Sequence, residues 1–409
     1  MLVNKIVLIG DKDNGKSTTI GNLLILTKSI SDARLNEAKK ISMQLGRKFE
    51  PGFLLDSFFE ERKNAMTIDT TRAELMYKNA AFEFIDVPGH KTLIKNMISG
   101  ASYANVALLI VSAKKGEGVK AQTKRHVFIT NMLGINKLIV AVNKMDTVGY
   151  SQEAFEAVKS KLGKFFEKAG MQNSNVVFIP ISAYNQENLI KKSDKMKWYK
   201  GRPLLEELYQ QVKQKTSGKS INGAIVLLQG TINKGSDKLI IGKVLNGSIK
   251  ANSTMMQLPD REKVKIRRLF VKGARVKEAV KGENIAAEVV GGISGEPKGK
   301  ILTDTSGVEV VKTGKEIKVR LLFAEKPDTK SMMLNFNNKN IACKLGRVQQ
   351  VIDSATGNRL SKLKALCVVD SALKLDEYIA YTEFSKLKEL GEFALYSKNK
   401  FIGFGNIVE

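Results

Sequence analysis

A glycine-rich run near the start of the chain carries the clearest chemistry. Four residues separate Gly10 from Gly15, and Lys16 and Ser17 follow directly, which is the Gly-x4-Gly-Lys-Ser pattern of a phosphate-binding loop. The backbone N–H groups of such a loop point at phosphate oxygens, the lysine reaches the β- and γ-phosphates, and the serine hydroxyl ligates Mg²⁺. The residues expected to contact the nucleotide here are Asp13, Asn14, Gly15, Lys16, Ser17 and Thr18.

A second motif, Asp86-Val87-Pro88-Gly89-His90, directly follows the apolar run Phe82–Ile85. An aspartate at the end of a strand can hold Mg²⁺ through water. The N–H of Gly89 can meet a γ-phosphate because no side chain blocks the approach. Thr67 precedes this motif and is a candidate switch residue whose hydroxyl closes on Mg²⁺ when the γ-phosphate is present. The expected metal ligands are Ser17, Thr67 and Asp86.

Two further motifs predict which base is bound. Asn143-Lys144-Met145-Asp146 ends an apolar run, and the Asp146 carboxylate can accept from both N1–H and the 2-amino group of guanine, which adenine cannot match. The stem of Lys144 can lie over the base, and a backbone N–H at Ser182-Ala183 can meet the guanine O6. Each short motif is weak alone, but the four in this order and spacing predict a guanine-specific site for GTP or GDP.

The elements that must position these motifs follow from the pattern of residues 1–215. Strand-like runs alternate there with amphipathic helical stretches, which predicts an α/β domain with a mostly parallel sheet and helices on both faces. Ligands in such folds bind beyond the C-terminal ends of the strands, where the motifs fall. The strands are expected at Phe82–Asp86, Val106–Ser112, Leu138–Asn143 and Val176–Ile181. The helices are expected at Gln122–Leu133, Gln152–Ala169 and Arg202–Lys213.

The remainder of the chain has a different pattern. A polar linker runs from Lys215 to Gly223, and short strands separated by Gly, Asn and Asp turns follow with little helical periodicity. This pattern predicts two all-β barrels, at residues 221–305 and 308–409, with a linker near Thr303–Thr313 between them.

Composition adds an expectation about partners. The chain has 67 Lys and Arg against 41 Asp and Glu, a net charge of +26, which suggests a polyanionic partner such as RNA; a generally basic or high-salt proteome is the alternative. Cys343 and Cys367 lack metal-type spacing, no apolar run approaches the roughly 18 residues of a membrane span, and the first strand leaves no room for a signal peptide. We therefore expect a cytoplasmic protein with reduced thiols and no membrane partner.

Together these motifs, with Lys91–Ser102, Gln122–His126 and Asn188–Leu208, resemble the elongation factor Tu/elongation factor 1-alpha superfamily of translational GTPases. The resemblance implies an α/β P-loop GTPase domain followed by two all-β barrel domains. It implies Mg²⁺-dependent GTP hydrolysis, with His90 as the catalytic residue that orients the attacking water. It also implies the ribosome and tRNA or another RNA as partners, and an exchange factor or a protein partner on the barrels as further ones.

The chain departs from the family pattern near the phosphates. Asp11, Lys12 and Asn14 stand where the family has two histidines and a valine, and Ala65 replaces a glycine before the switch threonine. The missing valine is half of an apolar gate in front of the catalytic histidine, and Lys12 places a cation there. Nucleotide binding is expected to survive these changes, whereas hydrolysis and its triggering by the ribosome are expected to be slow.

Two other functions fit parts of the sequence. The first is the GTPase subunit of a heteromeric sulfate adenylyltransferase, which shares this architecture and which the compact loop Lys115–Thr123 resembles. The second is a weakly hydrolysing ribosome-binding rescue or protection factor, which the altered gate motivates. The retained His90 and the charge of +26 favour the translation factor.

Overall fold

The computed structural model describes residues 3–44, 46, 49–54, 71–86, 104, 106–135, 137–168, 176–214, 221–234, 237–291, 295–329 and 331–408. The chain divides into two compact units. The first comprises Met1–Lys215 with Ser354–Asn358, and the second comprises Thr216–Asp353 with Arg359–Glu409. None of the helices in the described part of the chain is both long enough and apolar enough to cross a bilayer.

The first unit is built on a sheet of six described strands in the order β2-β3-β1-β4-β5-β6. All neighbouring pairs are parallel except β2–β3, which is antiparallel, so the mostly parallel sheet is confirmed. Every residue of β4 is buried, which explains the unbroken apolar run of a strand covered on both faces. The strands are β1 (Val3–Ile9), β2 (Thr71–Tyr77), β3 (Ala80–Asp86), β4 (Val106–Ser112), β5 (Leu138–Asn143) and β6 (Val176–Pro180).

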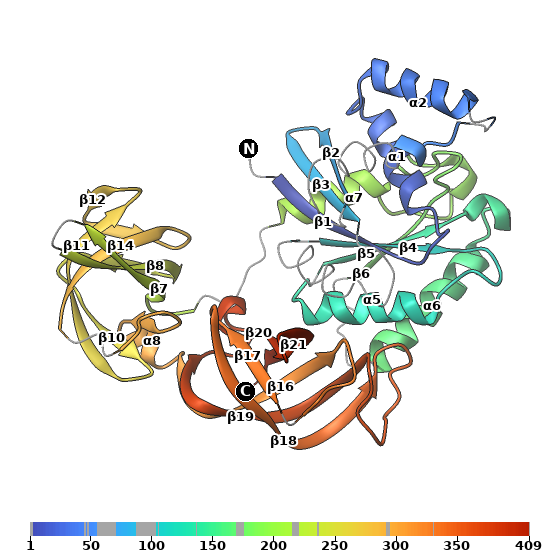
Figure 1. The fold of residues 1–409 in the computed structure, drawn as a ribbon. Helices are drawn as coiled ribbons and strands as arrows, with labels where there is room; N and C mark the ends of the chain where they lie inside the picture. Colours follow the sequence, from blue (N-terminus) through green and yellow to red (C-terminus); the bar gives the residue numbers. More distant parts are fainter. Residues whose placement is uncertain are drawn as a thin grey trace. The chain divides into compact units, whose positions relative to one another are not determined.

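Helices cover both faces of this sheet, as predicted. Ile20 and Leu23 of α1 and Leu208 of α7 pack on Ile6 and Leu8 of β1 in one apolar core. Figure 1 shows α5 and α6 on the opposite side of the sheet. The described α-helices of this unit are α1 (Lys16–Leu26), α2 (Asp32–Gln44), α5 (Ala121–Met132), α6 (Gln152–Lys168) and α7 (Leu204–Lys213). Short 3-10 helices lie at Met145–Val148 and Asp194–Met196.

Two elements of the first unit were not predicted from the sequence. Helix α2 buries only Ala38 and Ser42, so it has no broad apolar stripe from which a helix could be recognised. Strand β2 does alternate, with Ala73 and Leu75 buried, but it is an antiparallel edge strand without a chemical motif. The predicted elements differ from the observed ones by at most two residues at an end, except that β1 begins at Val3, three residues before the apolar run Ile6–Ile9 that predicts it.

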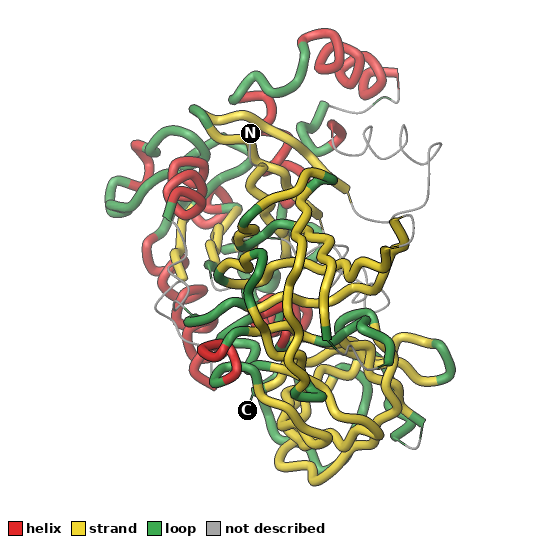
Figure 2. Tube along the Cα trace, turned by 90° about the vertical axis from the view of Figure 1, so that its left-hand side faces the viewer, coloured by secondary structure: helices red, strands yellow, loops and turns green. Residues whose placement is uncertain are grey.

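The described residues of the second unit form mainly strands, and they build two closed barrels as predicted. Figure 2 colours the strands of the chain yellow and its helices red. The pairing of β10 with β11 closes the first ring, β10-β15-β7-β8-β14-β11, and β12 (Ala274–Val276) extends it. Its strands are β7 (Ile225–Lys234), β8 (Asp237–Asn246), β10 (Thr254–Leu258), β11 (Glu262–Val271), β14 (Asn284–Val290) and β15 (Ile301–Thr303). Beside the ring, β9 (Ser248–Lys250) pairs with β13 (Glu278–Val280).

The second barrel has the ring order β16-β19-β18-β17-β20-β21, and β21 pairs with β16 to close it. Cys343 and Cys367 lie in its core as free thiols, and burial raises the pKa of Cys343 to about 12. The strands are β16 (Lys312–Phe323), β17 (Met332–Phe336), β18 (Lys339–Asp353), β19 (Cys367–Tyr381), β20 (Glu392–Ser397) and β21 (Lys400–Ile407), with a 3-10 helix at Lys388–Leu390.

The predicted linker between the barrels contains a short helix, α8 (Thr305–Val308). The Asp304 side chain caps it by accepting from the N–H of Gly307 at 2.8 Å. Leu258 and Ile301 of the first barrel share an apolar cluster with Ala380 and Leu390 of the second. The two barrels are therefore packed against each other through apolar side chains.

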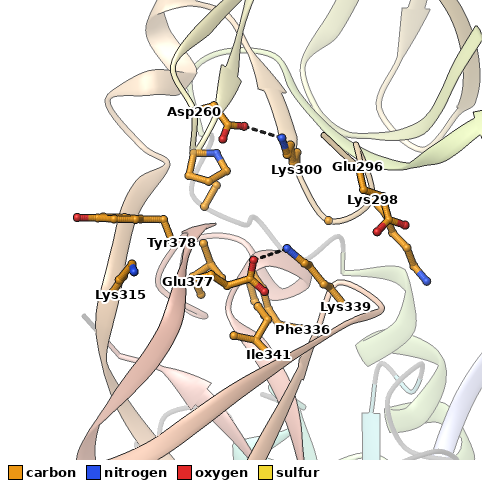
Figure 3. A pocket seen from close by; sticks show the side chains of 14 residues that line it. Asp260, Glu296, Lys298, Lys300, Lys315, Phe336, Lys339, Ile341, Glu377 and Tyr378 are labelled. Carbon is orange, nitrogen blue, oxygen red and sulfur yellow. Dashed lines mark hydrogen bonds and ion pairs between the residues drawn. The ribbon is translucent and has the colours of Figure 1, made fainter. Parts of the chain in front are cut away.

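Beside that contact is a cavity of about 390 Å³, called here the inter-barrel cavity (Figure 3). Lys300 pairs with Asp260 at 2.8 Å on the wall from the first barrel. Lys339 pairs with Glu377 at 2.5 Å on the wall from the second. Both pairs are partly exposed, and apolar side chains such as Phe336 and Ile341 complete the lining.

Candidate nucleotide-binding site

The predicted motifs of the first unit meet around one cavity of about 700 Å³, called here the nucleotide cavity. It opens beyond the C-terminal ends of β1, β3, β5 and β6, as expected for a parallel sheet. Of the predicted site residues, those that line it are Asp13, Gly15, Lys16, Ser17, Thr18, Asp86, Asn143, Lys144, Asp146 and Ala183.

The loop between β1 and α1 needs its glycines. Gly10 has φ +146°, and a Cβ there would lie 2.4 Å from the carbonyl oxygen of Ile110. Gly15 has φ +87°, caps the N-terminus of α1, and would place a Cβ 2.3 Å from Nδ2 of Asn143. Side chains at either position would collide with the neighbouring loops. The glycines thus let the loop pass close enough to place the start of α1 at the cavity.

Lys16 lies folded back over this loop. Its Nζ donates to the carbonyl oxygens of Gly10 at 3.1 Å and Asp11 at 3.0 Å. The buried carboxylate of Asp11 accepts from the hydroxyl of Thr123 on α5 at 3.0 Å. The residue that replaces a family histidine therefore ties the phosphate loop to α5, a role that the sequence did not indicate.

Asn143 joins the phosphate loop to the last loop of the site. Its Nδ2 donates to the carbonyl oxygen of Asn14 at 2.9 Å, and its Oδ1 accepts from the N–H of Ala183 at 2.8 Å. Asn14 in turn donates from Nδ2 to the carbonyl oxygen of Ile110 at 3.1 Å. Both asparagine side chains are 2% exposed or less, so these bonds are shielded from water. In this structure Asn143 lines the cavity, and Asn14 supports it from behind by bonding to β4.

Asp146 and Ser182 are also brought together. The Ser182 hydroxyl donates to Oδ1 of Asp146 at 2.6 Å, which fixes the carboxylate at the cavity. The N–H of Ser182 donates to the carbonyl oxygen of Glu187 at 3.2 Å, and that of Ala183 donates to Asn143. The backbone N–H groups predicted to meet a guanine O6 are thus engaged within the protein here.

Lys144 has a left-handed backbone, with φ +63°. Its Nζ lies 2.7 Å from Oε2 of Glu117, a residue that the sequence analysis did not select. This contact is the main reason that the pKa of Glu117 falls to about 2. Glu117 is therefore ionised throughout the physiological range.

The oxygen donors at the phosphate end fit Mg²⁺. The Ser17 hydroxyl and the Asp86 carboxylate line the same cavity. Mg²⁺ is usually held by one or two carboxylates together with waters and substrate phosphates, and it prefers hard oxygen ligands. The third predicted ligand, Thr67, lies outside the described residues, as do Gly89 and His90.

Other residues of the cavity were missed. Tyr184 follows Ala183 directly, is 69% exposed and lines the cavity, so its adjacency to the motif was a usable signal. Glu50 and Lys114 also line it, but neither belongs to a motif that marks a site. Chain folding alone brings these two side chains to the nucleotide cavity.

His126 is the histidine within the described residues. It is 4% exposed, and burial, with the charge of Lys16 as a second cause, lowers the pKa of its imidazole to about 4. Its Nε2 lies 3.2 Å from Nε2 of Gln122, while its buried Nδ1 has no hydrogen-bond partner within the described part of the chain. It is a neutral side chain in the body of the first unit.

Comparison with known proteins places the whole chain. Residues 2–217 match the family model "Elongation factor Tu GTP binding domain", residues 222–303 match "Elongation factor Tu domain 4", and residues 323–408 match "GTP-eEF1A C-terminal domain-like". Elongation factor 1-alpha of Sulfurisphaera tokodaii is 31% identical, over 99% of this chain and 96% of its own. The chain belongs to the elongation factor Tu/elongation factor 1-alpha family of translational GTPases.

Other relatives of this GTPase agree. Elongation factor 1-alpha of Plasmodium falciparum is 32% identical, over 98% of this chain and 94% of its own. The solved GTPase-like domain of S. cerevisiae Ski7, bound to GTP, is 17% identical with a TM-score of 0.52, and the match covers 100% of this chain and 97% of that one. That likeness concerns the fold alone. The family and the fold class predicted from the motifs are confirmed.

Proposed function

We propose that this protein is a GTP-hydrolysing translation factor that acts with tRNA or a tRNA-like partner on the ribosome. The observation that carries the proposal is the nucleotide cavity, where a phosphate loop, a strand-end aspartate and the Asn143–Asp146 motif meet. The proposal is also supported by the alignment of this chain, over 99% of its length, with an elongation factor 1-alpha.

Each end of the nucleotide has its own residues in this proposal. The N–H groups at the start of α1 and the Lys16 ammonium bind the β- and γ-phosphates of GTP. Asp146 accepts from N1–H and the 2-amino group of guanine, so adenine nucleotides are rejected. The stem of Lys144 and the ring of Tyr184 offer apolar surface to the base. An O6 contact at Ser182-Ala183 requires a shift of the bond from Ala183 to Asn143.

Ser17, Asp86 and Thr67 are the residues that would hold Mg²⁺. Such an ion neutralises charge on the β- and γ-phosphates when it is bound. Gly89 and Thr67 would sense the γ-phosphate, and its loss would release both segments. His90 would orient the attacking water. Lys12, which lines the cavity where the family has an apolar gate residue, supports a slow intrinsic rate.

The proposed partners, the ribosome and tRNA, are inferred from the net charge of the chain and from its relatives. A net charge of +26 suits binding to RNA phosphates, and the chain's relatives are named elongation factors. We favour this function over the sulfate adenylyltransferase subunit because the C-terminal segment matches an eEF1A-type model. An exchange factor or a barrel-binding protein, and a cytoplasmic location, belong to the same proposal.

The experiment is GTP turnover by the purified protein, alone and with cognate ribosomes, at two salt concentrations. Stimulation by ribosomes that fades with salt is expected, because the RNA contacts are electrostatic. Binding without stimulation would point to the rescue or protection factor. If ribosomes are neither bound nor able to stimulate turnover, the proposal is contradicted. His90→Ala is the matched control, and it should reduce turnover by about 100-fold while leaving GTP affinity near normal.

A further inference from the structure

The loop between β4 and α5 carries a carboxylate that lies behind the nucleotide cavity rather than in its lining. Glu117 is absent from that lining, yet its Oε2 lies 2.7 Å from Nζ of Lys144 and its Oε1 lies 3.1 Å from Nζ of Lys114. Both lysines do line the cavity. Glu117 therefore touches two cations of the site from outside it.

The carboxylate is itself held in place. The hydroxyl of Ser112, at the buried end of β4, donates to Oε2 of Glu117 at 2.9 Å. The N–H of Glu117 closes a turn onto the carbonyl oxygen of Lys114 at 3.1 Å, and Gly116 supplies φ +86° within it. The N–H of Ala113 donates to the carbonyl oxygen of Asn143 at 2.8 Å, which joins this loop to the end of β5. The turn is thus anchored to the end of β4 and to Asn143, the residue directly before Lys144.

Lys144 needs such support. A free lysine side chain has about 2 kcal/mol of rotamer entropy to lose when it is held in one conformation. The left-handed backbone of Lys144 fixes the direction in which its side chain leaves the main chain, but it does not fix the position of the ammonium group. The pairing with Glu117 confines that ammonium, and it also offsets the repulsion between Lys114 and Lys144.

We propose that Glu117 is a positioning residue that holds the Lys144 stem over the nucleotide base and so sets how long a guanine nucleotide stays bound. This inference rests on the proposed function, because it requires that the cavity binds GTP or GDP. The charge of this carboxylate is offset by the two lysines that it contacts, both of which line the cavity. Its effect is expected on the dissociation rate, because a Lys144 ammonium that is no longer confined lets the Lys144 stem leave the base.

The first test compares Glu117→Gln with the wild type, using GDP that carries a fluorescent group on its ribose. The amide keeps the shape and the Ser112 contact but loses the ion pair. Dissociation should become about fivefold faster, a size between that of an exposed ion pair and that of a charge-assisted hydrogen bond. Glu156→Gln is the matched control, because Glu156 forms an exposed ion pair with Lys159 on α6, away from the cavity lining. It should dissociate GDP at the wild-type rate.

A double-mutant cycle separates positioning from general support of the fold. In a Lys144→Ala background, Glu117→Gln should change the dissociation rate by less than about 1.5-fold, because its target is gone. A full fivefold effect in that background would overturn the proposal, as would a Glu117→Gln variant with the wild-type rate.

These measurements distinguish a failure of the proposed function from a failure of the role proposed for Glu117. If the wild type binds neither GDP nor GTP, the function is wrong, and this inference falls with it. If the wild type binds GDP and Glu117→Gln leaves dissociation unchanged, only the role of Glu117 is wrong. Melting of both variants, followed by the fluorescence of Trp198, is expected to match the wild type. That check matters because Trp198 lies in the first unit and reports its folding.

Discussion

The nucleotide cavity and the inter-barrel cavity are built in different ways. Around the nucleotide cavity, buried neutral side chains such as Asn143 and Asn14 bond to the backbone of another loop. Around the inter-barrel cavity, the described polar contacts include two ion pairs, Asp260–Lys300 and Glu377–Lys339, each within one barrel (Figure 3). The hydrogen bonds around the nucleotide cavity join separate segments of the chain. The ion pairs around the inter-barrel cavity lie on segments that each barrel already holds in place.

This difference predicts different sensitivity to substitution and to salt. Leaving a buried polar partner unsatisfied costs about 1–3 kcal/mol, and such bonds are shielded from ions. Partly exposed ion pairs contribute about 0.2–1 kcal/mol and are screened by salt. A site that must hold a ligand in one geometry therefore needs walls that are joined by buried hydrogen bonds.

The largest effect is expected from Asn143→Ala. The substitution leaves the carbonyl oxygen of Asn14 and the N–H of Ala183 without their partner inside the wall. Stability should fall by about 3 kcal/mol and GDP affinity on the order of 1,000-fold. Urea melts and calorimetric titration with GDP measure both. A mild loss of affinity at unchanged stability would break the comparison, because the wall would then not depend on this side chain.

Asp146→Asn should change recognition of the guanine base while leaving the stability of the fold nearly unchanged. An amide oxygen can still accept from the Ser182 hydroxyl, so stability should stay within about 0.5 kcal/mol. GDP affinity should fall on the order of 100-fold, and preference should move toward xanthine nucleotides, because the amide can donate where the carboxylate only accepted. Competition between the two nucleotides measures it. An unchanged preference for guanine would remove Asp146 from base recognition.

Acid should destabilise the first unit in the range where its buried histidine titrates. The folded pKa of His126, about 4, lies below its unfolded value near 6.5, so the unfolded chain binds more protons between these values. The first unit should therefore lose about 2 kcal/mol of stability as pH falls from 6.5 to 4.5. The second unit contains no histidine. Burial raises the pKa of its Glu392, whereas the hydrogen bond from Lys386 lowers the pKa of its Glu383, so these two carboxyls act in opposite directions as pH falls.

Urea melts at several pH values test this prediction, since Trp198 is the single tryptophan of the chain and reports on the first unit. His126→Gln should flatten the dependence of its transition on pH. A pH dependence that survives the substitution would assign the effect to another group.

The smallest effect is expected in the inter-barrel cavity. Glu377→Gln removes the pair with Lys339, of which both side chains are about 40% exposed. Stability should fall by about 0.5 kcal/mol at low salt and not measurably in 1 M NaCl, with GDP affinity unchanged. Calorimetric melts at two salt concentrations check it. A salt-independent loss above 2 kcal/mol would show that the two cavities are built alike.

Much of the first unit could be predicted because its signals are local. The glycines, Lys16 and Ser17 lie within one short run, and the strand-end motifs follow apolar runs that are buried in the structure. Helix α2 was missed because it buries little apolar surface, so it leaves no periodic signal. Tyr184 was missed although it adjoins a motif.

The sequence by itself determined the family and the fold class of the chain: a phosphate-loop motif within an α/β domain that two barrels follow. Only the tertiary structure decided that Asn143 bonds to Asn14, 129 positions away, that Asp11 bonds to Thr123, and that Glu117 supports Lys144. The physical reason is that motifs and periodicity are properties of neighbouring residues. A hydrogen bond between distant loops depends on how strand order and helix packing bring their side chains together.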